Sequence, residues 1–451
     1  MARITRRTAS GSLVAAASIS AGASASPQGA TAQPAAPPAF PDAAATDPVA
    51  LGWMQGTPPA PERRIAFEDG SFSRFPQTRW SFSNWRMFLR NVTVDRGDGP
   101  VWQLPVALRD DLDAVSFTPL GAAGPMSWRG ALAATYADAI LVLHRGRIVY
   151  ERTFGVTGLR SQHILFSVTK SFVGVLAQIL ISEGRLDPLA PVTSIIPELA
   201  GSGFGDATVR QVFDMTTALD YDETYTSAQS GIARYALAGR ITPRPPGYTG
   251  PEGFLDFAPT VAAGQGRHGE RFSYRTINTE VLAWLVARVE GKPVDQVLGE
   301  RIWSRLGMEA DAALVVDGVG TPMAGGGLMA RLRDCARFGE AMRLGGLADG
   351  RQAIPAAVVS AIASGGDPAK FDTASYPALP GASYHAQWWF THNAHGAYMA
   401  RGIHGQGIYI DPAAEMVIAR FGSHPIAGNA GNDPVTIPAY HALARALRAG
   451  G

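Results

Sequence analysis

The sequence has little cysteine and little lysine. The low cysteine content limits the possible disulfides and metal sites, and the low lysine content draws attention to each lysine. The single cysteine, Cys335, excludes an internal disulfide and a structural metal site built from cysteines. Of the 39 basic residues, only Lys170, Lys292 and Lys370 are lysines. Arginine stays protonated and cannot act as a base. A lysine in a sequence that otherwise uses arginine therefore indicates a functional role more strongly than usual.

Strong net charge and long apolar runs are also missing. The formal net charge is +1 over 451 residues, so charge does not indicate nucleic acid or an anionic membrane as a partner. Beyond the N-terminal region, no run approaches the length of an apolar membrane span. A content of 46% hydrophobic and 17% charged residues is ordinary for a soluble globular protein with a large core.

Residues 1–32 have the pattern of an export signal. Basic residues up to Arg7 precede a mildly apolar, alanine-rich stretch from Leu13 to Ala25, and small residues follow. The pair Arg6-Arg7 resembles a twin-arginine signal, so we expect an exported, periplasmic protein. A disordered tail on a cytoplasmic protein is the alternative. Residues 33–60, rich in proline and alanine, are expected to form an extended linker or surface wrap that leads to a domain at 61–451.

The most informative stretch runs from Ile164 to Leu180. An apolar approach leads into Ser167, and Lys170 follows three positions later at the head of an apolar-periodic segment typical of a helix. Positions i and i+3 share one face of a helix, so the serine hydroxyl and the lysine amine can come within hydrogen-bonding distance. A buried lysine can be neutral near pH 7 and can activate a serine. The pattern predicts a nucleophile with its base; the alternative is a helix cap beside a solvated lysine.

Strand patterns occur at both ends of the domain, and helical patterns lie between them. Alternation from Ala139 to Arg152 predicts a hairpin, and two strands are expected at Gly402–Asp411 and Met416–Phe421. Helices are expected at 208–215, 279–290, 294–306, 330–344 and 438–448. This order predicts an α+β fold, an α/β sandwich in which an antiparallel sheet built from both termini is flanked by helices. A helical lobe is inserted at about 185–330, and Ser167 should lie in the cleft between sheet and lobe.

Two further segments supply candidate site groups. Tyr274 lies on a loop just before a helix, and a tyrosine beside a lysine can relay protons because a neighbouring cation lowers its pKa. A tyrosine packed under the next helix is the alternative. The glycine-rich stretch 401–407 allows close approach of a backbone or ligand, so an N–H there can complete an oxyanion hole with that of Ser167.

No cofactor is expected. Four of the nine histidines fall in one region, but their spacing matches no zinc pattern and no carboxylate is close to them in sequence; they are His385, His392, His395 and His404. The G-x-S-x-G elbow of α/β-hydrolases is absent from the sequence, which disfavours that fold.

Several of these segments together resemble a known superfamily. Ser167-Val168-Thr169-Lys170, then Tyr274 and then the glycine-rich strand resemble the serine β-lactamase and penicillin-recognising superfamily, in its class C and esterase branch. The resemblance is closest to the 6-aminohexanoate-dimer hydrolase branch and rests on the segments Met215–Tyr221, Asn278–Trp284, Gln387–Trp389 and Gly402–Gln406. It extends from about Trp80 to Arg445, and it implies a β-lactamase/transpeptidase-like fold.

The resemblance also implies roles at the matching positions. Ser167 would be the acylated nucleophile, Lys170 its base and Tyr274 the proton relay, while the N–H groups of Ser167 and Ile403 would form the oxyanion hole. Tyr225 matches a tyrosine that hydrogen-bonds the substrate amide. The other expected substrate-binding residues are Asn278, His404 and Trp388, the last within an aromatic set with Tyr221, Trp389 and Tyr398.

Two departures from the superfamily pattern bear on the activity. The usual Tyr-x-Asn is Tyr274-Arg275-Thr276 here, which leaves Asn278 as the substitute for an asparagine that orients the lysine. The usual Lys-Thr-Gly is replaced by Ala400-Arg401-Gly402, which makes β-lactamase or transpeptidase activity less expected.

We therefore predict a serine hydrolase that cleaves an ester or linear amide bond of a small molecule through an acyl-enzyme. A penicillin-binding protein, D-aminopeptidase or β-lactamase is one alternative. A non-catalytic binding or sensor protein with the same fold is another. The sequence leaves the oligomeric state open.

Overall fold

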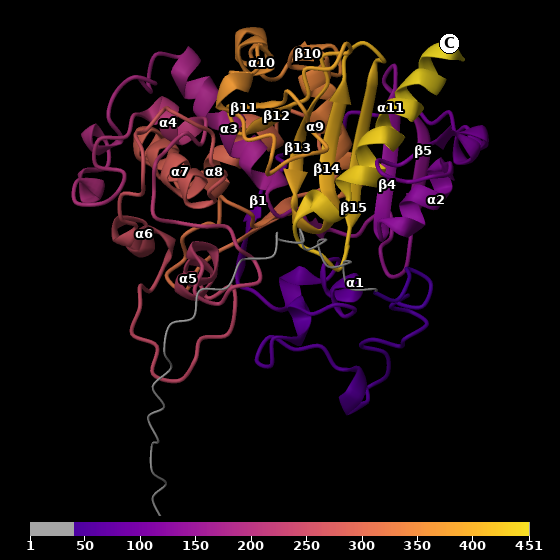
Figure 1. The fold of residues 1–451 in the computed structure, drawn as a ribbon, viewed down its shortest axis with the longest axis horizontal. Helices are drawn as coiled ribbons and strands as arrows, with labels where there is room; N and C mark the ends of the chain where they lie inside the picture. Colours follow the sequence, from indigo (N-terminus) through magenta and orange to yellow (C-terminus); the bar gives the residue numbers. More distant parts are fainter. Residues whose placement is uncertain (1–39, 451) are drawn as a thin grey trace, which may run out of the picture. The chain divides into compact units, whose positions relative to one another are not determined.

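The structure is a computed structural model that describes residues 40–450, so the export signal expected in residues 1–32 lies outside the described residues. Residues from Pro41 onward form one compact unit around a seven-stranded antiparallel sheet (Figure 1). In spatial order its strands are β11 (Ser383–His385), β12 (Trp388–Phe390), β13 (Tyr398–Gly402), β14 (Gln406–Asp411), β15 (Met416–Gly422), β4 (Ala137–His144) and β5 (Arg147–Thr153). The strands from the two ends of the domain meet where β15 pairs with β4.

Apolar side chains on both faces of the central strands explain why both faces are covered. Successive residues of a strand point to opposite faces. In β4, Leu141 and Leu143 enter one hydrophobic cluster, whereas Ile140 and Val142 enter another on the opposite face. The central strands are therefore buried on both sides, and the fold needs a layer of helices on each.

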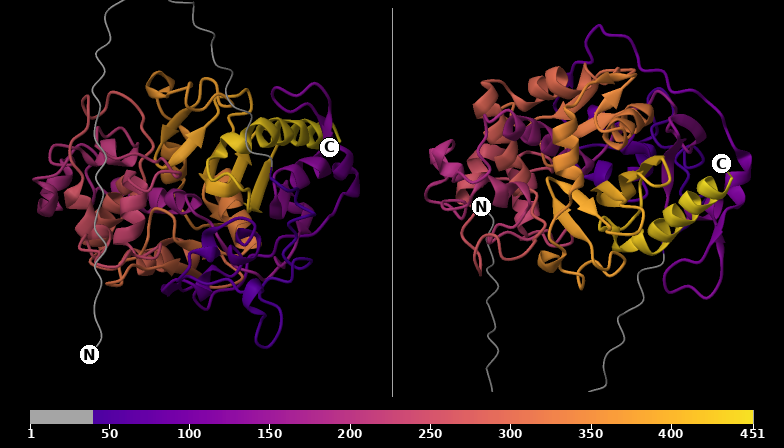
Figure 2. Two further views of the ribbon diagram at one scale, coloured as in Figure 1. Left: turned by 60° about the horizontal axis from the view of Figure 1, so that its bottom comes forward. Right: turned by 90° about the horizontal axis from the view of Figure 1, so that it is seen from above.

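Helices supply these two layers. On one face α9 (Leu332–Arg343) packs on β14, β15 and β4. On the other face α11 (Asp433–Ala449) and α2 (Trp128–Ala134) pack on each other, and both contribute to the same hydrophobic cluster as that face of the sheet. In the view from above, α11 lies along one side of the strands (Figure 2). This arrangement confirms the predicted fold class.

The inserted lobe is mostly helical, as predicted, and lies to one side of the sheet (Figure 1). Its helices are α4 (Val209–Phe213), α5 (Gly231–Ala238), α6 (Phe254–Phe257), α7 (Ile277–Glu290) and α8 (Val294–Leu298), the last continued by a π-helical turn at Gly299–Trp303. The helix α3 (Val168–Ser182) packs against α7 and α8 of the lobe, against β13 of the sheet and against α10 (Ala356–Ala363). The helix that begins after Ser167 is thus the element through which sheet and lobe join.

A second sheet was not anticipated. It has four antiparallel strands in the order β1 (Asn91–Val94), β7 (Ala312–Val315), β8 (Leu328–Ala330) and β6 (His163–Ile164). Its strands are two to four residues long and come from distant parts of the chain, so no alternation long enough to recognise exists in the sequence. Two short ribbons, β2 (Ser116–Phe117) with β3 (Met126–Ser127) and β9 (Leu347–Ala348) with β10 (Arg351–Gln352), complete the strands of the described residues.

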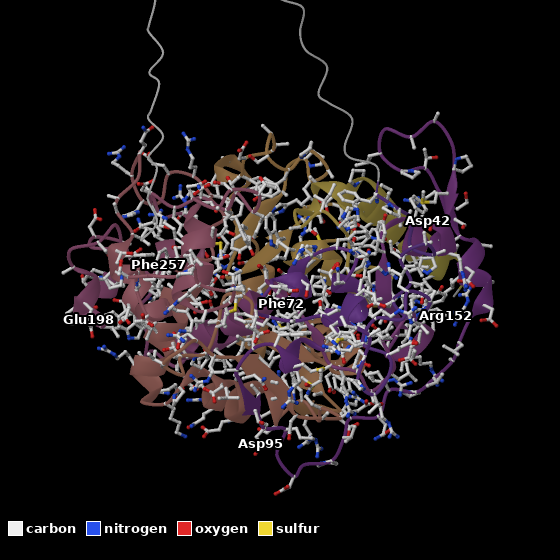
Figure 3. The ribbon with its side chains drawn as sticks, turned by 90° about the horizontal axis from the view of Figure 1, so that it is seen from below. Asp42, Phe72, Asp95, Arg152, Glu198 and Phe257 are labelled. Carbon is white, nitrogen blue, oxygen red and sulfur yellow. The ribbon has the colours of Figure 1, made fainter. Side chains whose placement is uncertain are left out.

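The segment before β1 packs beneath this second sheet. Its aromatic residues lie in and after the short helix α1 (Thr78–Ser81), and a 3-10 turn follows at Trp85–Met87. Phe72, Phe82 and Trp85 are buried against Ile164 and Val315. Figure 3 shows Phe72 near the middle of the view from below, with Phe257 and Glu198 of the lobe to one side.

The N-terminal linker predicted at 33–60 is described only from residue 40. From Pro41 to Ala60 the chain forms turns, and Trp53 and Met54 are partly buried against the same cluster as Phe72. In this part the segment lies on the domain as a surface wrap.

The predicted hairpin and the helix ends agree with the structure to within a few residues, but the C-terminal strands differ from the prediction. The expected strand at Gly402–Asp411 is interrupted: β13 ends at Gly402, a 3-10 turn covers Ile403–Gly405 and β14 begins at Gln406. The turn depends on a left-handed backbone at His404 (φ 60°) and at Gly405 (φ 91°), which a continuous strand would not allow. Among the described residues no helix is both long and apolar enough to cross a membrane.

Gly174 provides a test of how tightly α3 packs on the sheet. A Cβ at this position would lie 2.3 Å from the carbonyl oxygen of Ala386. Alanine favours a helix over glycine by about 1 kcal/mol, but here the clash with backbone outweighs that gain. We expect Gly174→Ala to lower the free energy of unfolding by about 2 kcal/mol in urea titrations.

The matched control is Gly201→Ala, since a Cβ at Gly201 meets no atom within 4 Å. It should change the stability by less than about 0.5 kcal/mol. A stabilising effect of Gly174→Ala would contradict the close packing of α3.

Candidate active site

A sharp turn of the backbone presents Ser167 at the start of α3. Phe166 has a left-handed backbone conformation (φ 43°), which turns the chain between β6 and the helix. Ser167 occupies the N-cap position, but its side chain makes no capping hydrogen bond. Its hydroxyl is therefore available to other groups.

Lys170 lies one turn further on, and its amine is buried under Ser167. The Nζ atom lies 2.9 Å from Ser167 Oγ, 3.1 Å from Thr276 Oγ1 and 2.5 Å from the carbonyl oxygen of Gly325. A neutral amine has two N–H donors, which Thr276 and Gly325 can accept, and its lone pair is then left for the Ser167 hydroxyl. The geometry suits a lysine that takes a proton from the serine.

Burial and charge act on this amine in opposite directions. Loss of hydration lowers the pKa of Lys170 to about 8, while the carboxylates of Glu223 and Glu280 oppose that shift. A substantial fraction of Lys170 is thus neutral near pH 8. A neutral amine is what a base that takes the serine proton requires.

Thr276 holds the place of the asparagine missing from the sequence. It is the third residue of Tyr274-Arg275-Thr276, and its hydroxyl accepts a hydrogen bond from Lys170. The backbone N–H of Thr276 donates to the Glu223 carboxylate, which fixes the loop before α7. A hydroxyl oxygen can therefore replace the amide oxygen as the lysine's acceptor.

Asn278 does not fill that role. It is fully buried inside the first turn of α7, where its amide oxygen accepts from Thr217 and its amide nitrogen donates to the carbonyl of Arg275. Its side chain makes no hydrogen bond to Lys170. The predicted substitution by Asn278 is therefore corrected to Thr276.

Tyr274 lies beside Ser167 and Lys170, but its pKa is shifted in the direction opposite to the prediction. Its phenol hydrogen-bonds Ser167, and its ring centroid lies 5.2 Å from Lys170 Nζ. Burial raises the pKa of Tyr274 well above 10, which outweighs the effect of nearby cations. The expected lowering by a neighbouring cation is thus wrong, because desolvation dominates; Tyr274 remains a phenol that can donate a proton.

The end of β13 lies against the start of α3. A Cβ on Gly402 would be 2.6 Å from the carbonyl oxygen of Leu165 and 3.2 Å from the nitrogen of Ser167, so only glycine allows this approach. The next residue, Ile403, begins a 3-10 turn, whose first N–H has no acceptor within the turn. Gly402 thus brings the end of β13 up to the backbone nitrogen of Ser167, and an oxyanion hole formed by the N–H groups of Ser167 and Ile403 stays a prediction.

A cavity of about 550 Å³ opens over these groups. Its walls are mostly apolar or aromatic, and Ser167 and Tyr274 lie among its lining residues with Ile403, Trp389, Tyr376 and Leu120. Two charged residues of the wall neutralise each other, since Arg401 donates to both carboxylate oxygens of Asp433 at 2.6 Å. The cavity suits a small organic molecule with an uncharged chain.

Tyr225 and Glu223 are also among the residues that line the cavity. Tyr225 is 40% exposed, and its hydroxyl donates a 2.8 Å hydrogen bond to Glu223. Its oxygen can still accept a hydrogen bond, and the substrate contact implied for Tyr225 stays a prediction. Glu223, which orients both Tyr225 and Thr276, was not predicted.

Trp388 and His404 lie elsewhere. Trp388 is fully buried, stacks on Phe338 and is not part of the cavity wall; its neighbour Trp389 faces the cavity instead. Adjacent strand residues point to opposite faces, so an error of one position reverses the assignment. The His404 imidazole donates its Nδ1–H to the carbonyl oxygen of His424, and its ring contacts the Phe82 ring. Of the wider aromatic set, Tyr221 and Tyr398 are also buried outside the wall.

The four clustered histidines have separate partners. His385 lies against Asp214, His392 against Ser383, His395 against Asp411 and His404 against the His424 carbonyl. In the part of the chain that the structure describes, no group of His, Cys, Asp or Glu side chains could hold a metal ion.

An antiparallel sheet with an inserted helical lobe, and a serine and lysine pair where they meet, defines the class of β-lactamase/transpeptidase-like proteins. The family model described as Beta-lactamase matches residues 130–426. The chain belongs to the beta-lactamase family and is a hydrolase of that family.

Two relatives are similar over most of their length. The "6-aminohexanoate-dimer hydrolase" of Paenarthrobacter ureafaciens is 33% identical over 390 residues, which cover 86% of this chain and 91% of the relative. The solved structure named "Putative 6-aminohexanoate-dimer hydrolase from Bacillus anthracis" has a TM-score of 0.77 and 31% identity, and covers 87% of this chain and 99% of that one.

A more distant neighbour shares the fold alone. It is "EstCE1, a hydrolase with promiscuous acyltransferase activity", with a TM-score of 0.52, 16% identity and coverage of 68% of this chain and 92% of that one.

Thr276 allows a test of the lysine's support. In Thr276→Val the methyl group cannot accept the lysine's hydrogen bond, so the amine loses one of its three partners. We expect labelling of Ser167 by a fluorophosphonate probe to slow about tenfold at pH 8. Thr276→Ser, which keeps the hydroxyl, should label within about twofold of the wild type; equal slowing of both variants would argue against the hydrogen bond.

Proposed function

We propose that this protein hydrolyses small linear amides or esters through an acyl-enzyme on Ser167. The observation that carries the proposal is the buried Lys170 amine, 2.9 Å from Ser167 Oγ at the wall of an open apolar cavity. Similarity to the two 6-aminohexanoate-dimer hydrolases supports a linear amide as the natural bond type.

In the proposed first half-reaction, Ser167 Oγ attacks the carbonyl carbon while its proton passes to Lys170. The oxyanion accepts hydrogen bonds from the N–H groups of Ser167 and Ile403. The Tyr274 phenol protonates the leaving nitrogen or oxygen, and the proton held on Lys170 restores the phenol. Because burial raises the pKa of Tyr274 well above 10, the phenol is protonated before this transfer.

In the second half-reaction a water molecule takes the place of the leaving group. It gives a proton back through Tyr274 and Lys170 as its oxygen attacks the acyl carbon, and Ser167 Oγ leaves with that proton. Bonds and protons balance over the two steps, so the pathway consumes only water.

The cavity wall supports a preference for uncharged chains next to the scissile bond. Trp389 and Tyr376 provide apolar surface, and Arg401 is already paired with Asp433. The Tyr225 oxygen is placed to accept a hydrogen bond from the N–H of an amide substrate. An ester lacks that donor, so Tyr225 contributes more to amide than to ester hydrolysis.

The pH dependence of kcat/KM follows from the protonation of Lys170. Only the neutral amine can accept the serine proton, so activity should rise about tenfold per pH unit and level off above the lysine pKa of about 8. The pKa of Tyr274, raised by burial, predicts no fall from that residue up to pH 10. A profile that is flat between pH 6 and pH 9 would contradict the assignment of Lys170 as the base.

A substrate panel on purified variants tests the proposal itself. With p-nitrophenyl acetate, p-nitrophenyl butyrate and the linear dimer of 6-aminohexanoate, Ser167→Ala and Lys170→Ala should lose about 10³-fold or more in kcat/KM, and Tyr274→Phe about 10²-fold. Lys292→Ala, which changes an exposed lysine paired with Glu300, is the control and should match the wild type.

Two outcomes would overturn the proposal. One is hydrolysis by Ser167→Ala at the wild-type rate. The other is turnover of nitrocefin with far higher kcat/KM than any ester or linear amide, which would favour a β-lactamase.

A further inference from the structure

A turn between β7 and β8 supports the lysine from below. Gly325, in this turn, accepts the shortest of the three lysine hydrogen bonds, at 2.5 Å. The turn is closely packed: a Cβ on Gly325 would lie 2.4 Å from Cγ2 of Thr276 and 2.9 Å from Oε1 of Glu280. The position of the Lys170 amine therefore depends on the contacts that fix this turn.

Glu280 of α7 fixes the turn between β7 and β8 by hydrogen bonds. One carboxylate oxygen accepts from the N–H of Gly325 at 2.7 Å and from the Tyr235 hydroxyl at 2.6 Å, and the other accepts from the N–H of Ala324 at 3.1 Å. The side chain is 1% exposed. A buried carboxyl group with three donors is held in one place, and Gly325 links it to Lys170 through adjacent peptide groups.

The titratable groups that interact with Glu280 come from two helices and one loop. They are Lys170 of α3, Tyr235 of α5 and Tyr221 of the loop before α5, and Glu223 of that loop acts on the same lysine. Lys170 is the cation among them. Burial raises the pKa of Glu280 to about 7, and the Glu280 charge in turn raises the pKa of Lys170 against the effect of burial.

We propose that Glu280 is a positioning residue that fixes both the place and the charge state of the Lys170 amine through the Ala324-Gly325 turn. It lies outside the cavity wall formed around Ser167, so it acts on the reaction only through Lys170. This inference rests on the proposed function, because it assigns Glu280 a part in the activity of the serine and lysine pair.

The experiment compares pH profiles of kcat/KM for p-nitrophenyl butyrate. Glu280→Gln removes the negative charge, so the lysine loses its proton more easily and the acid limb should move by about one pH unit toward acid. The plateau should also fall about tenfold, because the carboxamide holds the turn less well. Glu280→Asp keeps the charge but is shorter, so its acid limb should stay at the wild-type position while its plateau falls.

Glu290→Gln is the matched control. Glu290 ends the same helix, pairs with Arg185 and Arg301 at the surface, and should affect neither limb nor plateau. A purely structural role of Glu280 predicts a lower plateau with an unmoved limb in Glu280→Gln, and that result would overturn the proposal.

Folding is checked by thermal unfolding of each variant. If Glu280→Gln does not fold, Glu280→Asp decides: a plateau equal to the wild type, or a limb displaced toward acid, would overturn the inference. Failure of the proposed function would give a different result, because the wild type would then be inactive or Ser167→Ala would be active.

Discussion

Burial of the Lys170 amine is the constraint on which the rest of the site depends. An ammonium group is costly to remove from water, and burial therefore favours its neutral form. The nearby carboxylates of Glu223 and Glu280 limit that effect, which leaves the pKa of Lys170 at about 8. The same residue type in bulk water has a pKa of about 10.4 and is almost fully charged at neutral pH. A balance of desolvation and negative charge thus gives Lys170 the pKa that its proposed role as a base requires.

The fold provides each part of this balance from a different element. The start of α3 carries Ser167 and Lys170, the residues before α7 carry Tyr274 and Thr276, and the turn between β7 and β8 carries Gly325. The end of β13 adds the Ile403 N–H from the other side. Because α3 packs against both sheet and lobe, its position sets the spacing between all of these groups. This explains why glycines stand where α3 meets other backbone, at Gly174 and Gly402.

Much of this could be predicted from the sequence, for a physical reason. Ser167 and Lys170 lie on one helix turn, so their contact follows from helix geometry, and the long apolar alternation of the hairpin made the central sheet visible. The sequence does not predict groups that come close together only in the tertiary structure. Glu223 and Glu280 are ordinary carboxylates in the sequence, and only folding brings them to the lysine. The sequence does not show which side of a three-residue strand faces the cavity, so it cannot distinguish Trp388 from Trp389. It also does not show that the Thr276 hydroxyl, rather than the Asn278 amide, accepts the lysine's hydrogen bond.

Because the sequence has only three lysines, the lowered pKa of Lys170 can be measured directly. In the double variant Lys292→Arg and Lys370→Arg, Lys170 is the only lysine left in the chain, so ¹³Cε-labelled lysine gives a single side-chain NMR signal of the folded protein. The account predicts that this signal titrates with a midpoint near pH 8. A midpoint at the value of a solvated lysine, about 10.4, would contradict it.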